Sequence, residues 1–184
     1  MTGKRIAGSS IAQWLPVLFI GIPPLALTRC DPVHDDAKAA LGPEAPGVPR
    51  GPLHRPGQPC LVCHDGDTGD PPRFTVGGTV FQTSGALLPA IGVDVHLKDV
   101  NGATADLQTN AAGNFYVTPG QYDPAFPVTA NVQGPDGTVR MWTLIEGNGT
   151  VEPNGGCASC HFDPAGADSP GHLCLRLEDG GTPP

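Results

Sequence analysis

The chain carries one short motif twice, as CLVCH at residues 60–64 and as CASCH at residues 157–161. In each copy two residues separate a pair of cysteines, and a histidine follows the second cysteine directly. Thiols and an imidazole at this spacing are typical of covalent attachment of c-type haem, of half a four-thiolate zinc site, or of a redox dithiol. A structural disulfide within each pair is a fourth alternative, because small exported proteins use disulfides.

Haem attachment accounts for every residue of both motifs. The two thiols add to the vinyl groups of the haem, and the adjoining histidine becomes the proximal iron ligand. A zinc site would leave both histidines without a role, and a redox dithiol lacks the thioredoxin-like βαβ context that lowers a thiol pKa. The sequence therefore predicts two covalent haem c groups, with zinc, disulfide and dithiol as alternatives. The attachment residues are Cys60, Cys63, His64, Cys157, Cys160 and His161.

Each iron needs a ligand on its second axial side. His54 lies ten residues before His64, and His172 lies eleven residues after His161. Either connection can extend on the order of 30 Å, so the chain can return around a haem. We expect His54 at the first haem and His172 at the second, where Met141 is the competing ligand. Histidines on both sides leave no room for a substrate, which favours an electron carrier over an enzyme.

Between the motifs, short alternating runs predict β-strands. They cover residues 74–83, 91–100, 103–109, 114–117, 126–132 and 138–145. Turn residues separate the runs, and no helical period is present, which is typical of an antiparallel β-sandwich or barrel. In the run 91–100, valine and leucine alternate with polar residues, so His96 should point to solvent. Six strands would place both motifs at one end of such a fold, and a seventh would separate them.

Part of this stretch resembles the carboxypeptidase-regulatory-like, or transthyretin-like, β-sandwich. The similarity is carried by G-x-V at residues 78–80, V-x-L-x-D-x-x-G at residues 95–102 and T-x-x-x-G-x-F at residues 109–115. The resemblance implies a scaffold and no activity. With the two motifs, the whole chain resembles small exported multihaem c-type cytochromes, which implies electron transfer. The expected fold is therefore mainly β, an antiparallel β-sandwich flanked by two loop-rich haem-binding segments.

The N-terminus is typical of an export signal. Lys4 and Arg5 precede an apolar run at residues 14–22, which is short for a membrane span and is followed by prolines. Residues 27–30 resemble a bacterial lipobox, which would make Cys30 a lipidation site, although Arg29 departs from that pattern. We expect an exported protein of the periplasm, outer membrane or cell envelope. Its one membrane attachment would be a lipid anchor at Cys30, and the alternative is ordinary cleavage nearby that leaves Cys30 as a spare thiol or a disulfide partner.

The charge composition limits the classes of binding partner that the protein can have. The formal charge is −8, and it becomes −11 (7 basic against 18 acidic residues) once the three basic residues of the signal are removed. Such a surface disfavours nucleic acid and favours redox partners with basic patches. The Pro/Gly-rich run at residues 42–59 predicts an extended, polyproline-like linker.

The expected division of the chain is a signal at 1–29, a linker at 30–59, a first haem segment at 60–73, a sandwich at 74–146, and a second haem segment with a tail at 147–184. The predicted function is a dihaem electron carrier. The alternative is a non-redox extracytoplasmic binding or adhesion module, held by disulfides or by a four-cysteine zinc site.

Overall fold

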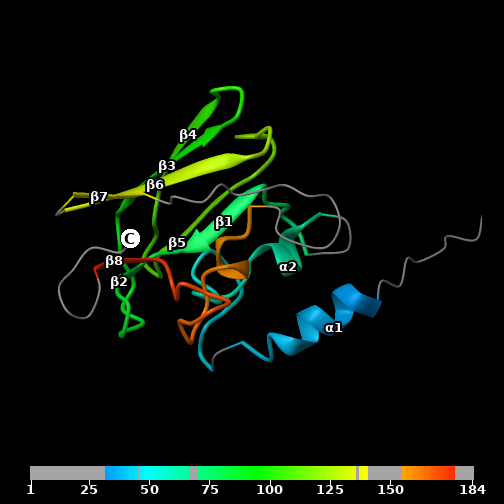
Figure 1. The fold of residues 1–184 in the computed structure, drawn as a ribbon. Helices are drawn as coiled ribbons and strands as arrows, with labels where there is room; N and C mark the ends of the chain where they lie inside the picture. The colour runs from blue at the N-terminus through cyan, green and yellow to red at the C-terminus, as the bar shows by residue number, and fades with distance from the viewer. Residues whose placement is uncertain (1–31, 45, 67–69, 136, 141–154, 177–184) are drawn as a thin grey trace, which may run out of the picture.

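The computed structural model of the chain describes residues 32–44, 46–66, 70–135, 137–140 and 155–176. The signal segment, Cys30 and Met141 therefore lie outside the described residues. Within the described ranges the fold is mainly β, and its two principal sheets are antiparallel, as the sequence predicts (Figure 1). No helix in these ranges is both long and apolar enough to cross a bilayer.

The largest sheet has four strands in the order β4-β3-β6-β7. Their bounds are Asp94–Asp99 for β3, Thr104–Gln108 for β4, Val128–Gly134 for β6 and Gly137–Arg140 for β7. Strand β3 alternates strictly between exposed and buried residues, which confirms the predicted period of two. His96 is exposed on this sheet, and its Nδ1 lies 2.6 Å from Asp106 Oδ1 on β4.

Two smaller sheets lie beside it. Strand β1 (Val76–Thr79) pairs antiparallel with β5 (Asn114–Val117), and β2 (Phe81–Thr83) pairs in parallel with β8 (Cys174–Arg176). The single strand expected at residues 74–83 is thus divided at Val80, whose amide donates to the Gly113 carbonyl instead of to the β1–β5 ladder. Strand β8 was not predicted, because its residues pair with a strand about ninety positions earlier in the chain.

The hydrophobic core is formed by side chains of the four-stranded sheet and of the β1–β5 sheet. Its most deeply buried side chains come from β1, β3, β5 and β6 and from the residue between β1 and β2: Val76, Val80, Val95, Leu97, Val117 and Val128. Cys157, in the second motif, belongs to the same buried cluster. The core therefore joins the sheets to one of the two motifs.

Both motifs form short helices. Helix α2 spans Leu61–His64 and the 3₁₀ helix η1 spans Cys157–Ser159, each placing its two cysteines about one turn apart. They lie near β1 and away from β4, while helix α1 (Pro32–Ala40) contacts α2 (Figure 1).

The extended conformation expected for residues 42–59 is wrong. The segment runs as turns and bends. The Arg55 guanidinium donates to the carbonyls of Leu41 and Gly42, and the Asn114 side-chain amide donates to the carbonyls of Pro52 and His54. These long-range bonds fold the segment back onto β5, because backbone carbonyls in proline-rich turns lack ladder partners and take side-chain donors instead.

Candidate functional site

The two motifs meet on strand β1. The Gly77 amide donates to the Gly155 carbonyl at 3.0 Å, and Gly77 pairs with Gly156 in a parallel bridge. A Cβ atom at Gly77 would lie 3.6 Å from Cys60 Sγ, and one at Gly78 would lie 3.0 Å from Cys157 Sγ. Successive strand residues face opposite sides, so the motifs approach β1 from its two faces.

This proximity does not follow from the strand count. Among the described residues, seven strands, β1 to β7, lie between the motifs, and a seventh strand was expected to separate them. Direct pairing of the residues before η1 with β1 brings the second motif back, whatever the direction of the intervening strands. Counting strands was therefore the wrong basis for placing the motifs.

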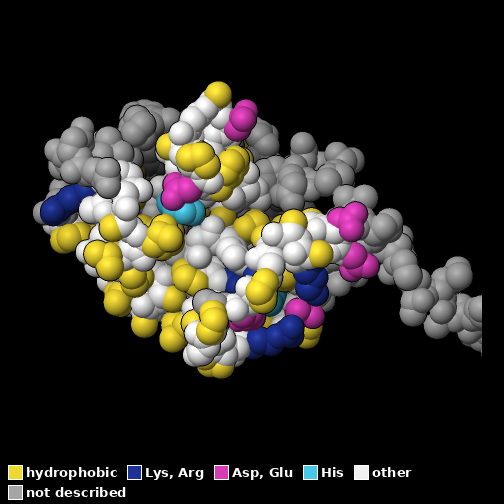
Figure 2. Space-filling model, turned by 90° about the horizontal axis from the view of Figure 1, so that it is seen from below, with side chains coloured by type: hydrophobic (Ala, Val, Ile, Leu, Met, Phe, Trp, Pro, Cys, Tyr) yellow, Lys and Arg dark blue, Asp and Glu magenta, His cyan; other side chains and the backbone are white. Residues whose placement is uncertain are grey.

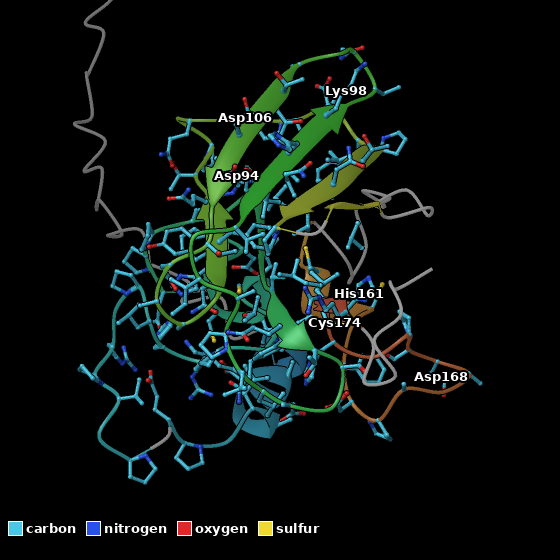
Figure 3. All side chains as sticks on the ribbon, turned by 90° about the vertical axis from the view of Figure 1, so that its left-hand side faces the viewer. Asp94, Lys98, Asp106, His161, Asp168 and Cys174 are labelled. Atoms are coloured by element: carbon cyan, nitrogen blue, oxygen red, sulfur yellow. The ribbon has the colours of Figure 1, made fainter. Side chains whose placement is uncertain are left out.

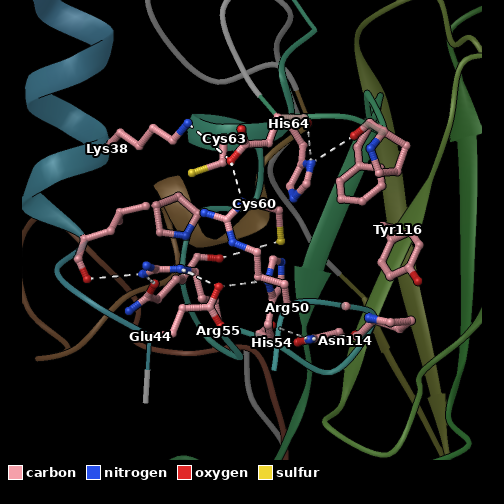
Figure 4. A pocket seen from close by; sticks show the side chains of 18 of the residues that line it. Lys38, Glu44, Arg50, His54, Arg55, Cys60, Cys63, His64, Asn114 and Tyr116 are labelled. Carbon is pink, nitrogen blue, oxygen red and sulfur yellow. Dashed lines mark hydrogen bonds and ion pairs between the residues drawn. The ribbon is translucent and has the colours of Figure 1, made fainter. Parts of the chain in front are cut away.

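The first motif lines a cavity of ≈ 520 Å³. That volume lies within the ordinary range for small-molecule and cofactor sites. Cys60, Cys63 and His64 lie on one side, and His54 reaches it from the turns of residues 42–59 (Figure 4). The structure thus brings together three predicted attachment residues and the predicted sixth ligand of the same haem.

His64 is held in a single orientation. Its Nδ1 lies 2.9 Å from the carbonyl oxygens of both Asp70 and Pro72. Carbonyls only accept hydrogen bonds, so Nδ1 carries the proton and Nε2 keeps its lone pair for a metal. The ring also packs on Phe74, at 4.4 Å between ring centres, and Phe74 stacks on Tyr116 at 4.5 Å. Backbone acceptors that fix the ring of a metal-binding histidine are a common feature of metalloproteins.

The ring of His54 lies opposite that of His64. Their centres are 5.8 Å apart and their planes are inclined by 46°. Two imidazoles that bind one metal from opposite sides, through bonds of about 2.0–2.1 Å, have ring centres roughly 6 Å apart. His54 Nε2 has no hydrogen-bond partner among the described residues, which leaves this nitrogen available to a metal. The donor set therefore fits a haem iron.

The cavity gathers positive charge in an acidic protein. Lys38, Arg50 and Arg55 line it, which is three of the seven basic residues that follow the signal. Lys38 and Arg50 pair with Asp70 at 3.3 and 3.8 Å, and a hydrogen bond from Lys38 is the main reason that the Asp70 pKa lies below its usual value. Seen from below in Figure 2, basic and acidic side chains lie close together on one part of the surface, with hydrophobic side chains around them. Guanidinium and ammonium groups suit a ligand that carries carboxylates, as haem does.

The first cysteine of each motif lacks the lowered pKa that dithiol chemistry needs. Burial raises the pKa of Cys60 to about 11 and that of Cys157 to about 12. Burial also raises the pKa of Cys63, partly offset by Lys38 and Arg55. Redox dithiols have lowered thiol pKa values, so these shifts are opposite to those of a thioredoxin-like site.

The second motif is arranged differently. His161 Nδ1 lies 3.0 Å from the Gly171 carbonyl, which again leaves Nε2 as the ligating atom. Burial lowers the pKa of His161, which favours the neutral imidazole that a metal requires. However, Cys157 is buried in the core, whereas Cys160 is exposed. The imidazole fits the proposed role, but the Cys157 thiol is closed off in this conformation.

His172 is close to His161, and it already has partners. Its Nε2 lies 3.2 Å from Asp163 Oδ2, and its ring packs on Phe81 at 5.0 Å between centres. Its Cε1 would also lie 3.3 Å from a Cβ at Gly57, so this residue touches the turns that precede the first motif. The structure therefore places His172 between the two segments, with Nδ1 as the ring nitrogen that has no partner among the described residues.

Cys60, Cys63, Cys157, Cys160 and Cys174 are all free, and no three histidine, cysteine or acidic side chains of the described residues converge as a metal site. Cys174 is buried on β8, away from the polar outer face of the large sheet on which Asp94, Lys98 and Asp106 lie (Figure 3).

Sequence reasoning missed the residues that complete the cavity. Lys38, Glu44, Arg50 and Arg55 come from segments assigned to a linker, and Asp70 comes from a polar turn. The scarcity of basic residues after the signal, with three of them within 25 positions of Cys63, was the one signal that could have found them.

Comparisons of the chain with protein-family models, with curated proteins and with solved structures find no match.

Proposed function

We propose that this protein is an exported dihaem c-type cytochrome that carries electrons in the bacterial cell envelope. The observation that carries the proposal is the pair His54 and His64, whose rings face each other at 5.8 Å beside Cys60 and Cys63. Haem bound there would supply reversible one-electron chemistry at iron. The β-sheets would then serve as a regulatory-like sandwich scaffold that holds the two cofactor segments together.

The residues of the first site have separable tasks in this proposal. Cys60 and Cys63 form the thioethers, and the Asp70 and Pro72 carbonyls keep His64 Nε2 directed at the cavity. Lys38, Arg50 and Arg55, which already contact Asp70 and Glu44, would offset the negative charge of the propionates. Because His54 and His64 would hold the iron from both sides, the site would leave no room for a substrate, which favours a carrier over an enzyme.

The second site uses Cys157, Cys160 and His161, with His172 as the proposed sixth ligand. Burial of Cys157 requires that its thioether form before the core closes over it. The acidic surface supports a redox partner with a basic patch. The signal-like N-terminus supports export, with Cys30 as the proposed lipid anchor.

The test is expression in a periplasmic host that carries the haem-attachment machinery. The expected result is two covalent haems per chain in a pyridine haemochrome assay, and a low-spin spectrum in both oxidation states. A matched control is the Cys60→Ala/Cys63→Ala chain, which should keep one haem, at the second motif. A colourless protein, produced in cells that mature a reference cytochrome normally, would overturn the proposal.

A further inference from the structure

Glu44 has a carboxylate that the proposed haem site leaves unexplained. It lies in the turns after α1 and lines the cavity of the first motif. Its Oε1 is 3.3 Å from His54 Nδ1 and 3.8 Å from Arg55 Nε. Its Oε2 is buried and has no hydrogen-bond partner among the described residues. A buried carboxylate oxygen without a partner is costly, so its position calls for an explanation.

The imidazole of His54, which faces this carboxylate, also lacks a hydrogen bond. Its Nδ1 is also buried and makes no hydrogen bond to any described residue, although Glu44 Oε1 is close, because the two groups are not aligned. A small rotation of either side chain would convert the 3.3 Å contact into an Nδ1–H donation to the carboxylate. His54 Nδ1 would then have a partner in Glu44 Oε1, while Oε2 would keep none among the described residues.

The two histidines of the cavity are therefore supported by different chemistry. His64 donates to neutral backbone carbonyls, whereas His54 faces a carboxylate. A carboxylate that accepts the second N–H of a metal-bound imidazole fixes the ring and makes it a stronger electron donor to the metal. A stronger donor favours the more highly charged, oxidised metal.

We propose that Glu44 is a positioning residue for His54, which it orients toward the iron of the first haem while holding that haem at a lower reduction potential. This inference rests on the proposed function. Arg55 contacts the same carboxylate oxygen as His54 and limits the effect by sharing its charge. The second site has a different arrangement, because Asp163 contacts His172 through Nε2.

The experiment compares the haem-loaded wild-type chain with Glu44→Gln, Glu44→Ala and the control Asp36→Asn. Glutamine keeps an acceptor oxygen and the side-chain size but removes the charge. Asp36 is an exposed residue of α1, so its substitution makes the same charge change away from His54. The measurements are the haemochrome count, a redox titration that resolves both haems, and the low-temperature EPR spectrum of the oxidised protein.

With Glu44→Gln, one of the two midpoint potentials should shift to a more positive value, and the EPR g-values of that low-spin haem should change. Glu44→Ala should add a high-spin component, because His54 loses its support. Midpoint potentials and EPR spectra that match those of Asp36→Asn would overturn the role of Glu44. An absence of haem in the wild-type chain would instead overturn the proposed function, so the two failures are distinguishable.

Discussion

Gly78 of β1 is in such close contact with Cys157 that a Cβ atom at residue 78 would lie 2.8 Å from Cys157 Cβ. The same atom would also lie 3.1 Å from the Phe115 ring. Its neighbour Gly77 has ordinary spacing, because the nearest atom to a Cβ there is Cys60 Cβ at 3.4 Å. Both motifs therefore pack against strand β1. The contact of the second motif, through Cys157, is much tighter than that of the first motif, through Cys60.

The substitution Gly78→Ala should destabilise the protein by about 1–3 kcal/mol, the usual cost of overpacking a closed interior. Gly77→Ala is the matched control, because it makes the same chemical change in the same strand with room to accommodate it. The free energy of unfolding of both variants, from urea titration, checks this. Equal stabilities for the two variants would contradict the close contact with Cys157.

The substitution His54→Ala should remove one of two low-spin haem signals while leaving two covalent haems per chain. In the proposed site the thioethers and His64 would stay in place, so attachment would continue and only the sixth ligand would be lost. His96→Ala is the control, because His96 lies exposed on the outer face of β3, where it pairs with Asp106. The optical and EPR spectra of the oxidised proteins measure the difference. A fully low-spin His54→Ala protein would assign the sixth ligand to another residue.

The substitution Leu97→Ala should cost about 2–5 kcal/mol of unfolding free energy, since it removes a large buried side chain and leaves a cavity. Leu97 is 1% exposed in the core of β3, whereas Leu87 is 65% exposed in the loop before it. Leu87→Ala should therefore change stability by less than about 0.5 kcal/mol. Similar losses for the two variants, measured by urea titration, would argue against the described core.

The haem-free chain should lose stability in alkali. The folded-state pKa values of Cys60 and Cys157 are raised from 9.0 to about 11 and about 12, so the folded protein binds these protons more tightly than the unfolded chain. The resulting stabilisation is complete below pH 9 and is lost as the pH rises toward 11 and 12. Unfolding midpoints across this range measure the effect.

Haem loading provides the control for that measurement, because thioethers do not titrate. The haem-loaded chain should lack the part of the alkaline loss that comes from these two thiols. A haem-free chain whose stability does not fall more steeply than that of the loaded chain between pH 9 and 12 would contradict the burial of the two thiols.

Local patterns predicted the parts of the fold that depend on local chemistry. The alternation in residues 94–99 indicated the buried and exposed faces of β3, because a strand repeats every two residues whatever its partners. The Cys-x-x-Cys-His spacing likewise implied that a single turn holds both cysteines of each motif, and α2 and η1 are such turns.

The parts of the fold and of the cavity that were not predicted depend on contacts between segments that are far apart in the sequence. Strand β8 exists because residues 174–176 pair with Phe81 and Thr83, and three residues have no periodicity to detect. The turns of residues 42–59 depend on Asn114, about sixty positions away. The cations of the cavity were missed for the same reason, since only the fold brings Lys38 and Arg55 to Cys63.

The burial of Cys157 restricts when this thiol can react. A thiol that is part of the hydrophobic core is out of reach of any enzyme once the sheets have closed. If haem is attached at the second motif as proposed, the attachment would have to precede the packing of residues 155–161 against β1. Under that proposal, a chain that folds first would keep an empty second site, and the rate of folding would compete with the supply of haem.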